Sequence, residues 1–111
     1  MQKLALNHTL IFQMGPLDQG YWPDGLYTAP TDEALRWEVD QIKAWGFNMI
    51  RKHIKVEPER WFTHCDRAGI LVWQDMPSTF KLRSDDDKAQ FETELSRLVR
   101  SHWNHPSIVN W

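Results

Sequence analysis

Charged side chains follow two apolar runs of the sequence. Arg51 and His53 come directly after the run 47–50, and Asp75 comes shortly after the run 70–73. An arginine at the end of a strand can hold a carboxylate through two parallel hydrogen bonds and so position it. The other interpretation is a basic residue that faces solvent at a strand end, and the residues alone leave both open.

The second run ends in an aromatic and an acidic side chain. Side chains alternate between the two faces of a strand, so Trp73 and Asp75 share one face and Gln74 lies on the other. An aromatic wall beside a carboxylate suits a polar ligand with one apolar face, which is the shape of a sugar. A core tryptophan next to an aspartate that caps a loop is an equally good interpretation.

A long loop is predicted over residues 15–30, which contain several glycines and prolines. Loops of this length more often serve binding than connection. Within it, segment 18–25 holds two aromatic, two acidic and one amide side chain. This composition is typical of a loop that contacts carbohydrate, and also of one that packs its own aromatic rings. Its position favours binding, with Asp18 and Trp22 as candidate contacts.

Strands and helices that would position these residues alternate along the chain. Apolar and β-branched runs predict four strands, and capping residues with helical periodicity predict three helices. Thr31 and Ser84 are the predicted N-caps, Pro58 is predicted at the first helical position, and Gly46 and Gly69 are predicted just past helix ends. The predicted strands are 9–14, 47–50, 70–73 and 108–111, and the predicted helices are 32–45, 58–68 and 85–103.

The order β-α-β-α-β-α-β, with continuous apolar strands, predicts an α/β fold with a parallel sheet. Two architectures fit four such strands: a small open doubly wound sheet, or half of an eight-stranded barrel, which normally takes about 250 residues. In both, ligands bind beyond the carboxyl ends of the strands. Those ends are predicted at 13–15, 51–53 and 73–75, and after Trp111.

Composition narrows the function classes. The 111 residues are 41% hydrophobic and 25% charged, with a formal charge of -2, so no basic field attracts nucleic acid or an anionic membrane. No apolar run reaches the roughly 18 residues of a membrane span, and no signal peptide is visible. The single cysteine, Cys65, excludes a disulfide framework and a zinc site of several thiolates. Neither a nucleotide-binding glycine motif nor a metal-binding H-E-x-x-H pattern is present, so no cofactor and no metal are predicted.

Three segments together resemble successive landmarks of glycoside hydrolase family 2, which includes β-galactosidases, β-glucuronidases and β-mannosidases. They are 46–51, 65–75 and 104–111, and segment 18–25 also resembles the family's first-strand loop. The resemblance covers nearly the whole chain and implies the barrel rather than the open sheet. Residues 1–111 are therefore expected to form the N-terminal half of a (β/α)8 catalytic barrel.

The resemblance implies a retaining enzyme that hydrolyses β-linked O-glycosidic bonds in carbohydrate metabolism. Its acid/base glutamate is expected a few residues beyond Trp111 and its nucleophile later still, so this chain alone is expected to be inactive. The arginine that matches Arg51 lies under the reactive sugar and keeps the nucleophile ionised. The match at 73–75 is nearest to the β-mannosidase branch. Galactosidases and glucuronidases of the family carry a histidine three residues after this arginine, whereas His53 comes two residues after Arg51. The predicted substrate-binding residues are Arg51, Asp75, Trp73, Trp22, Asp18 and His53.

Alternatives of other classes are a non-catalytic carbohydrate-binding module and a self-associating scaffold. The predicted partner is a carbohydrate substrate in both the enzyme and the module. Half a barrel leaves two open strand edges and uncovered apolar surface, which predicts self-association of the chain. Localisation is not readable from these residues, although family members are often exported.

Overall fold

The computed structural model describes residues 4–78, 81 and 84–111. Nine helices and strands follow one another within this part of the chain. In order they are β1 (Ala5–Leu6), β2 (Thr9–Leu10), β3 (Leu17–Asp18), α1 (Asp32–Ala44), β4 (Met49–Lys52), α2 (Glu59–Ala68), β5 (Leu71–Gln74), α3 (Asp85–His102) and β6 (Ile108–Asn110).

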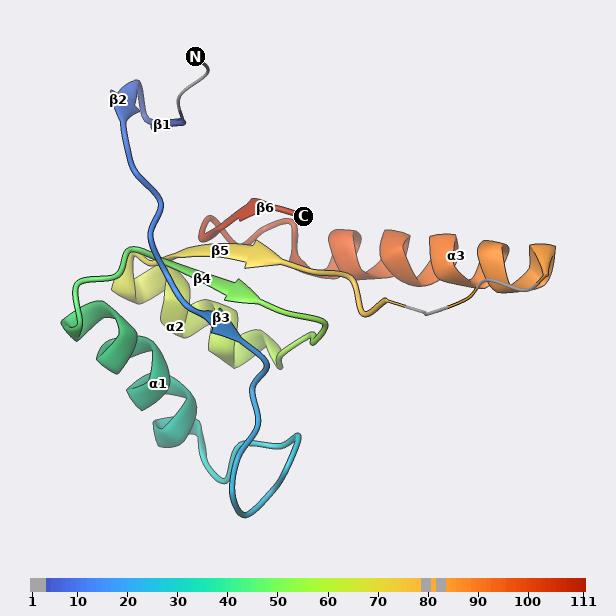
Figure 1. The fold of residues 1–111 in the computed structure, drawn as a ribbon, viewed down its shortest axis with the longest axis horizontal. Helices are drawn as coiled ribbons and strands as arrows, with labels where there is room; N and C mark the ends of the chain where they lie inside the picture. The colour runs from blue at the N-terminus through green and yellow to red at the C-terminus, as the bar shows by residue number, and fades with distance from the viewer. Residues whose placement is uncertain (1–3, 79–80, 82–83) are drawn as a thin grey trace.

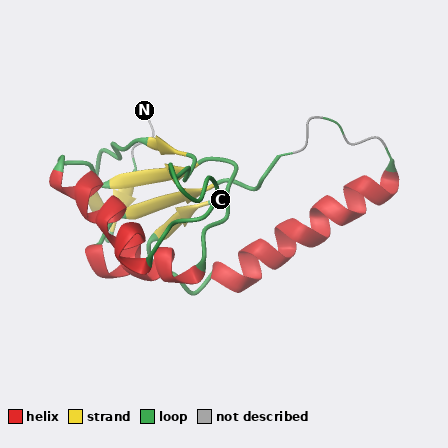
Figure 2. Cartoon of the chain, turned by 90° about the horizontal axis from the view of Figure 1, so that it is seen from below, coloured by secondary structure: helices red, strands yellow, loops and turns green. Residues whose placement is uncertain are grey.

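A four-stranded parallel sheet in the order β3-β4-β5-β6 forms the centre of the molecule (Figure 1). Its register pairs Leu17 with Arg51 and Arg51 with Trp73, and it shifts between Val72 and Trp73 against β6. Figure 2 shows the helices along one side of the strands and α3 extending away from the sheet. The predicted α/β class with parallel strands is confirmed.

The apolar core lies between α1, α2 and one face of the sheet. Leu35, Val39 and Ile42 of α1 are buried, as the sequence periodicity predicts. They pack with side chains of α2 and of the strands. Burial of each large apolar side chain contributes about 1.5 to 3 kcal/mol to the free energy of folding. The core cluster contains Leu35, Val39, Ile42, Ile50, Trp61, Phe62, Cys65, Ile70 and Val72.

Capping residues begin and end the helices close to the predicted positions. The Thr31 hydroxyl accepts from Ala34 N at 3.1 Å, and Ser84 forms a capping box with Asp87. Gly69 takes the left-handed conformation after α2, with φ 66. Pro58 is the N-cap of α2 rather than its first helical residue, a difference of one position.

The predicted first strand, 9–14, is wrong. Thr9–Leu10 pairs antiparallel with Ala5–Leu6 in a small hairpin, and the strand that joins the parallel sheet is Leu17–Asp18. Pro16, directly before β3, does not prevent this pairing. Proline lacks a backbone N–H donor, but its carbonyl accepts a hydrogen bond from Arg51 N at 3.0 Å. A Cβ on Gly15 would lie 1.6 Å from the Met49 carbonyl oxygen, so glycine permits the close approach.

Helix α3 buries little of its apolar face. Leu98 is its one buried side chain, at 7% exposure, whereas Phe91 and Leu95, which share its face by helical spacing, are partly exposed. Trp103, which caps the helix, is 73% exposed. The predicted apolar face therefore exists, but little of this chain covers it. No helix in the described part has the length and apolar character that a membrane crossing requires.

Candidate functional site

Arg51 and Asp75 form a bidentate ion pair at the carboxyl ends of two adjacent strands. Arg51 Nε donates to Asp75 Oδ1 at 3.1 Å, and a terminal guanidinium nitrogen donates to Asp75 Oδ2 at 3.0 Å. The hydrogen bond and the charge of Asp75 raise the pKa of Arg51. The Arg51 side chain is still 45% exposed. Both interpretations of Arg51 thus hold in part: it clamps a carboxylate, and it faces solvent.

Strand alternation explains why these side chains meet. Ile50 and Lys52 point toward the helices and are buried, so Arg51 between them points to the opposite, open face of β4. The register places Trp73 of β5 directly beside Arg51. Asp75, two residues later, lies on the same face as Trp73, as predicted.

His53 joins the pair from the segment that follows β4. Its Nδ1 accepts from the Gln19 amide at 2.9 Å, and its Nε2 lies 4.0 Å from Asp75 Oδ2. With Nδ1 as the acceptor, the ring hydrogen of neutral His53 is on Nε2, the nitrogen on the Asp75 side. Gln19 was not among the predicted site residues, although it belongs to the predicted binding loop.

Trp73 is held in place by its indole nitrogen, which donates to the side chain of Gln13. Its ring is partly exposed. The structure therefore brings together four of the six predicted residues on one open face. We call this group the clamp site: Arg51, His53, Trp73 and Asp75, with Gln19. It offers guanidinium, imidazole, amide and carboxylate groups beside an aromatic ring, which suits a polyhydroxylated ligand.

Asp18 lies elsewhere, because it pairs with Lys52 on the helix-covered side. Its Oδ2 contacts Lys52 Nζ, and its Oδ1 accepts from Gly20 N at 2.7 Å. Lys52 Nζ also lies 3.0 Å from Glu57 and 3.6 Å from Glu38. We call these four residues the lysine cluster.

Electrostatics hold the lysine cluster together despite its burial. Lys52 is fully buried and its ammonium lies 4.3 Å from the centre of the Trp61 ring. Burial alone lowers the pKa of Lys52, but the three carboxylates outweigh it, so the net pKa lies above the ordinary value and the ammonium stays charged. This cluster was not predicted. The sequence feature that could have indicated it is the position of Lys52. It lies two residues after Ile50 and therefore on the core-facing side of the strand.

Trp22 is also separate from the clamp site. It lines a shallow pocket of about 450 Å³ along α1, together with Glu33, Arg36, Trp37 and other residues of that helix. Its indole nitrogen is buried and has no hydrogen-bond partner among the described residues. The structure thus gives Trp22 a position against α1 rather than beside Arg51.

His64, His102, His105 and Cys65 have packing or pairing partners. His105 Nδ1 lies 2.6 Å from Asp66 Oδ2, and His64 Nε2 lies 3.1 Å from both carboxylate oxygens of Asp32. Burial raises the pKa of the Cys65 thiol. Within residues 4–78, 81 and 84–111, no three histidine, cysteine or acidic side chains are arranged to hold a metal ion.

Comparison with known proteins identifies relatives of one kind, although no family model matches the chain. A putative beta-glucuronidase of Formosa agariphila is 29% identical over 89 residues, which cover 78% of this chain and 11% of that protein. Other relatives are named beta-galactosidase and beta-mannosidase.

Solved structures show the same likeness in three dimensions. A beta-glucuronidase of Parabacteroides merdae matches 93% of this chain and 13% of its own, with a TM-score of 0.85 and 27% identity. A GH2 beta-galacturonidase of Eisenbergiella tayi matches 83% of this chain and 17% of its own, with a TM-score of 0.74 and 27% identity.

These likenesses confirm the predicted resemblance to glycoside hydrolase family 2 over most of the chain. The relatives are glycosidases, which hydrolyse sugar linkages. The chain spans about a tenth of the length of the curated relatives it matches.

Proposed function

We propose that residues 1–111 form the first half, strands one to four, of a (β/α)8 catalytic barrel in a retaining glycosidase of family 2. The reaction is hydrolysis of a β-linked O-glycosidic bond. The observation that carries the proposal is the Arg51–Asp75 clamp at the carboxyl ends of two neighbouring parallel strands. Substrate sites of such barrels lie at that end, and the relatives of the chain are glycosidases.

In this proposal the clamp site binds one sugar unit. Arg51 uses Nε and one terminal nitrogen on Asp75, which leaves further guanidinium hydrogens for a sugar hydroxyl or a neighbouring carboxylate. Asp75 accepts from hydroxyls, His53 completes the polar edge, and the Trp73 ring covers an apolar face of the sugar. Because the clamp fixes both charged groups before binding, little ordering is needed when the sugar arrives.

The catalytic carboxylates are proposed to lie outside these 111 residues. A retaining mechanism needs two carboxyl groups about 5 to 5.5 Å apart, one as nucleophile and one as acid/base. Asp18, Glu38 and Glu57 do not fit that role, because they surround the buried ammonium of Lys52. Asp75 is engaged by Arg51. We expect the acid/base glutamate, in an Asn-Glu pair, shortly after Trp111 in a longer protein.

The reading frame that follows the codon of Trp111 tests this proposal first. An Asn-Glu pair in the codons just beyond it supports the barrel. A frame that continues without any acidic residue there contradicts it.

Hydrolysis by the protein of the longer frame gives a second test. With p-nitrophenyl β-glycosides as substrates, Arg51→Met is expected to lower kcat/KM about a hundredfold, because the carboxylates at the sugar lose their positioning partner. Arg36→Met is the matched control, since Arg36 lies on the outer side of α1 with a 65% exposed side chain. Equal kcat/KM for Arg51→Met and the wild type contradicts a role in sugar binding.

A non-catalytic scaffold is the second candidate, and exposed apolar side chains favour it for the chain as it stands. Phe12 is 81% exposed, Trp103 73% and Trp45 68%. Strands β3 and β6 are the open edges of the sheet. We expect the 111-residue chain to form dimers or larger species in light scattering. A clean monomer contradicts the self-associating scaffold and leaves sugar binding to be measured separately.

A further inference from the structure

Loop 19–27 is fastened to the segment after β4 by a buried ion pair. Lys55 Nζ lies 3.0 Å from Glu57 Oε1 and donates to the Gly20 carbonyl at 2.7 Å. Lys55 and Glu57 are 3% and 4% exposed. Gly20 has φ 65, and a Cβ there would lie 2.3 Å from Glu57 Oε1, so the loop backbone rests directly on this pair. The beginning of the loop is therefore rigidly placed.

The far end of the loop is anchored through Tyr27. Its hydroxyl donates to the Ile54 carbonyl at 3.1 Å, and Lys55 Nζ lies 4.6 Å from the centre of its ring. Ile54 has φ 50, a left-handed conformation that a β-branched residue adopts only where its surroundings impose it. Both segments are thus shaped around Lys55.

Tyr21 packs on this anchored ring and remains open to solvent. The two tyrosine rings lie 5.2 Å apart at 62°, an edge-to-face arrangement. Tyr21 is 65% exposed and Tyr27 is 47% exposed. We call these two residues the tyrosine pair. A large aromatic surface that is both exposed and held from below is a surface prepared for a ligand.

The tyrosine pair lies beside the clamp site. Gln19, two residues before Tyr21, hydrogen-bonds to His53, and His53 lies 4.0 Å from Asp75. Ile54, which holds Tyr27, directly follows His53. Loop 19–27 begins at the carboxyl end of β3. Because β3, β4 and β5 are parallel, this is the end of the sheet at which Arg51 and Asp75 lie. Two links therefore connect the tyrosine pair to the clamp site: Gln19 through its hydrogen bond to His53, and Ile54 as the next residue along the chain.

We propose that Tyr21, supported by Tyr27, stacks against a second sugar ring of a β-linked oligosaccharide whose first ring occupies the clamp site. This inference rests on the proposed function. A flat aromatic ring complements the apolar C–H face of a pyranose, and tyrosine provides this area at a low cost in side-chain entropy. The aromatic contact predicted in this loop was Trp22, but Trp22 lies against α1. The most exposed aromatic ring of loop 19–27 is Tyr21.

Titration of the 111-residue chain with paired probes tests the inference. The pairs are methyl β-mannoside with β-mannobiose, and methyl β-galactoside with lactose, followed by ligand-observed NMR. In one of these series the disaccharide is expected to bind more tightly than the monosaccharide by roughly threefold to tenfold, the value of one aromatic contact. Tyr21→Ala is expected to remove this gain without weakening the monosaccharide.

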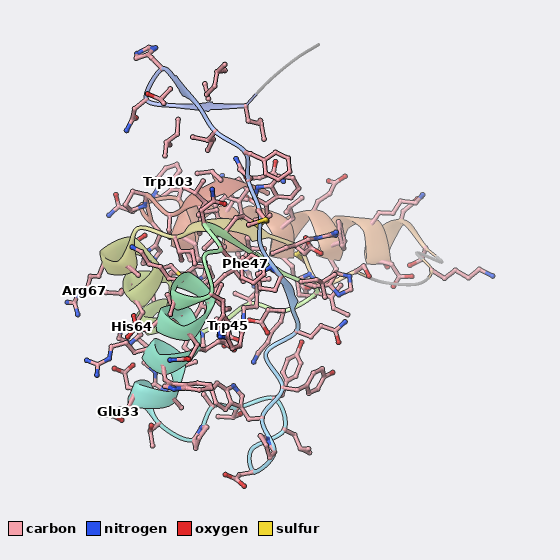
Figure 3. The ribbon with its side chains drawn as sticks, turned by 60° about the vertical axis from the view of Figure 1, so that its left-hand side comes forward. Glu33, Trp45, Phe47, His64, Arg67 and Trp103 are labelled. Atoms are coloured by element: carbon pink, nitrogen blue, oxygen red, sulfur yellow. The ribbon has the colours of Figure 1, made fainter. Side chains whose placement is uncertain are left out.

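Variants separate stacking from folding. Tyr21→Phe keeps the ring and is expected to keep the gain, and the thermal midpoint of each variant reports on its fold. Trp103→Ala is the control for loss of an exposed aromatic side chain, because Trp103 is 73% exposed and caps α3, outside both loop 19–27 and the clamp site. Figure 3 shows Trp103 well apart from Glu33, which lies at the start of α1. It is expected to leave both affinities unchanged.

The outcomes distinguish the two proposals. Equal affinity for monosaccharide and disaccharide, or a gain that survives Tyr21→Ala, overturns the stacking role and leaves the clamp site intact. Monosaccharide binding that survives Arg51→Met overturns the clamp site instead. Binding of neither sugar by a correctly folded chain overturns sugar binding by these 111 residues, at the clamp site and at Tyr21 alike, and favours the non-catalytic scaffold.

Discussion

Arg51 and Lys52, neighbours in β4, carry positive charges in two different environments on opposite faces of the sheet. Arg51 projects from the open face with a 45% exposed side chain and one carboxylate partner. Lys52 projects from the helix-covered face, is fully buried, and has three carboxylates around it. A buried charge must be compensated by the protein itself, whereas an exposed charge keeps donors available for a ligand. We therefore expect Lys52 to govern folding and Arg51 to govern function.

The largest expected effect follows from removing the buried cation. Lys52→Met leaves Asp18, Glu38 and Glu57 without their common partner, and we expect a loss of about 3 to 5 kcal/mol in unfolding free energy. Urea denaturation followed by tryptophan fluorescence measures this loss. Lys88→Met is the control, because the Lys88–Asp85 pair is exposed and is worth about 0.5 kcal/mol or less. A loss at Lys52 no greater than at Lys88 contradicts the structural role of the lysine cluster.

Gly20 tests how closely loop 19–27 rests on the Lys55–Glu57 pair. Gly20→Ala places a Cβ against Glu57 and Lys55 at a positive φ, and we expect it to cost about 1 to 3 kcal/mol. Gly46→Ala is the matched control, because Gly46 also has a positive φ but has no atom within 4 Å of the added Cβ. The difference between the two urea midpoints isolates the crowding from the strain. Identical midpoints would mean that the loop does not rest on the Lys55–Glu57 pair.

A smaller, pH-dependent effect is expected at Asp66, which joins α2 to the segment before β6. Burial raises the pKa of this carboxyl, but hydrogen bonds from Ser107 and His105 outweigh it, so the net pKa lies below the ordinary value. Its contribution to stability is therefore present above the unfolded pKa of about 3.9 and is lost as the pH falls through the lower folded pKa.

The variant Asp66→Asn measures this contribution. We expect it to be less stable than the wild type by about 1 kcal/mol at neutral pH, with the difference shrinking as the pH falls below about 4. Thermal unfolding across this pH range provides the measurement, with the exposed Asp85→Asn as control. A difference that does not change with pH would show that the carboxylate charge has no part in it.

The smallest effect on stability is expected at Arg51 itself. Arg51→Met removes an exposed side chain on the open face, so its urea midpoint should agree with that of Arg36→Met. Its effect should appear instead in sugar binding. If Arg51→Met unfolds at a much lower urea concentration than Arg36→Met, the distinction between the two faces fails.

Local features of the fold were predictable because their causes lie close together in the sequence. Thr31 and Ser84 cap helices through partners three residues away, and Gly69 ends α2 through its own φ. The buried stripe of Leu35, Val39 and Ile42 follows from the helical period. The first strand was missed because pairing with β4, rather than local β-propensity, selects Leu17–Asp18 over residues 9–14.

The candidate site was predictable only in part, because some of its contacts join residues that are distant in the sequence. Arg51 and Asp75 stand at strand ends, and the order of neighbouring parallel strands is enough to bring them together. Asp18 and Trp22 belong to a loop, where the direction of each side chain depends on what the loop rests on. Lys52 and Lys55 supply that support, and their role appears only when residues distant in the sequence meet.

The sequence by itself determined the parallel α/β class, the helix faces and the alternation that sends Arg51 and Lys52 to opposite faces of β4. These properties depend on periods of two and 3.6 residues and on capping within one turn. The tertiary structure alone decided the partners of each charge, which lie 24 residues away for Arg51 and 34 for the Asp18 partner of Lys52. The physical reason is burial: helices cover one face and force its charges to pair, while the open face keeps its donors for a ligand.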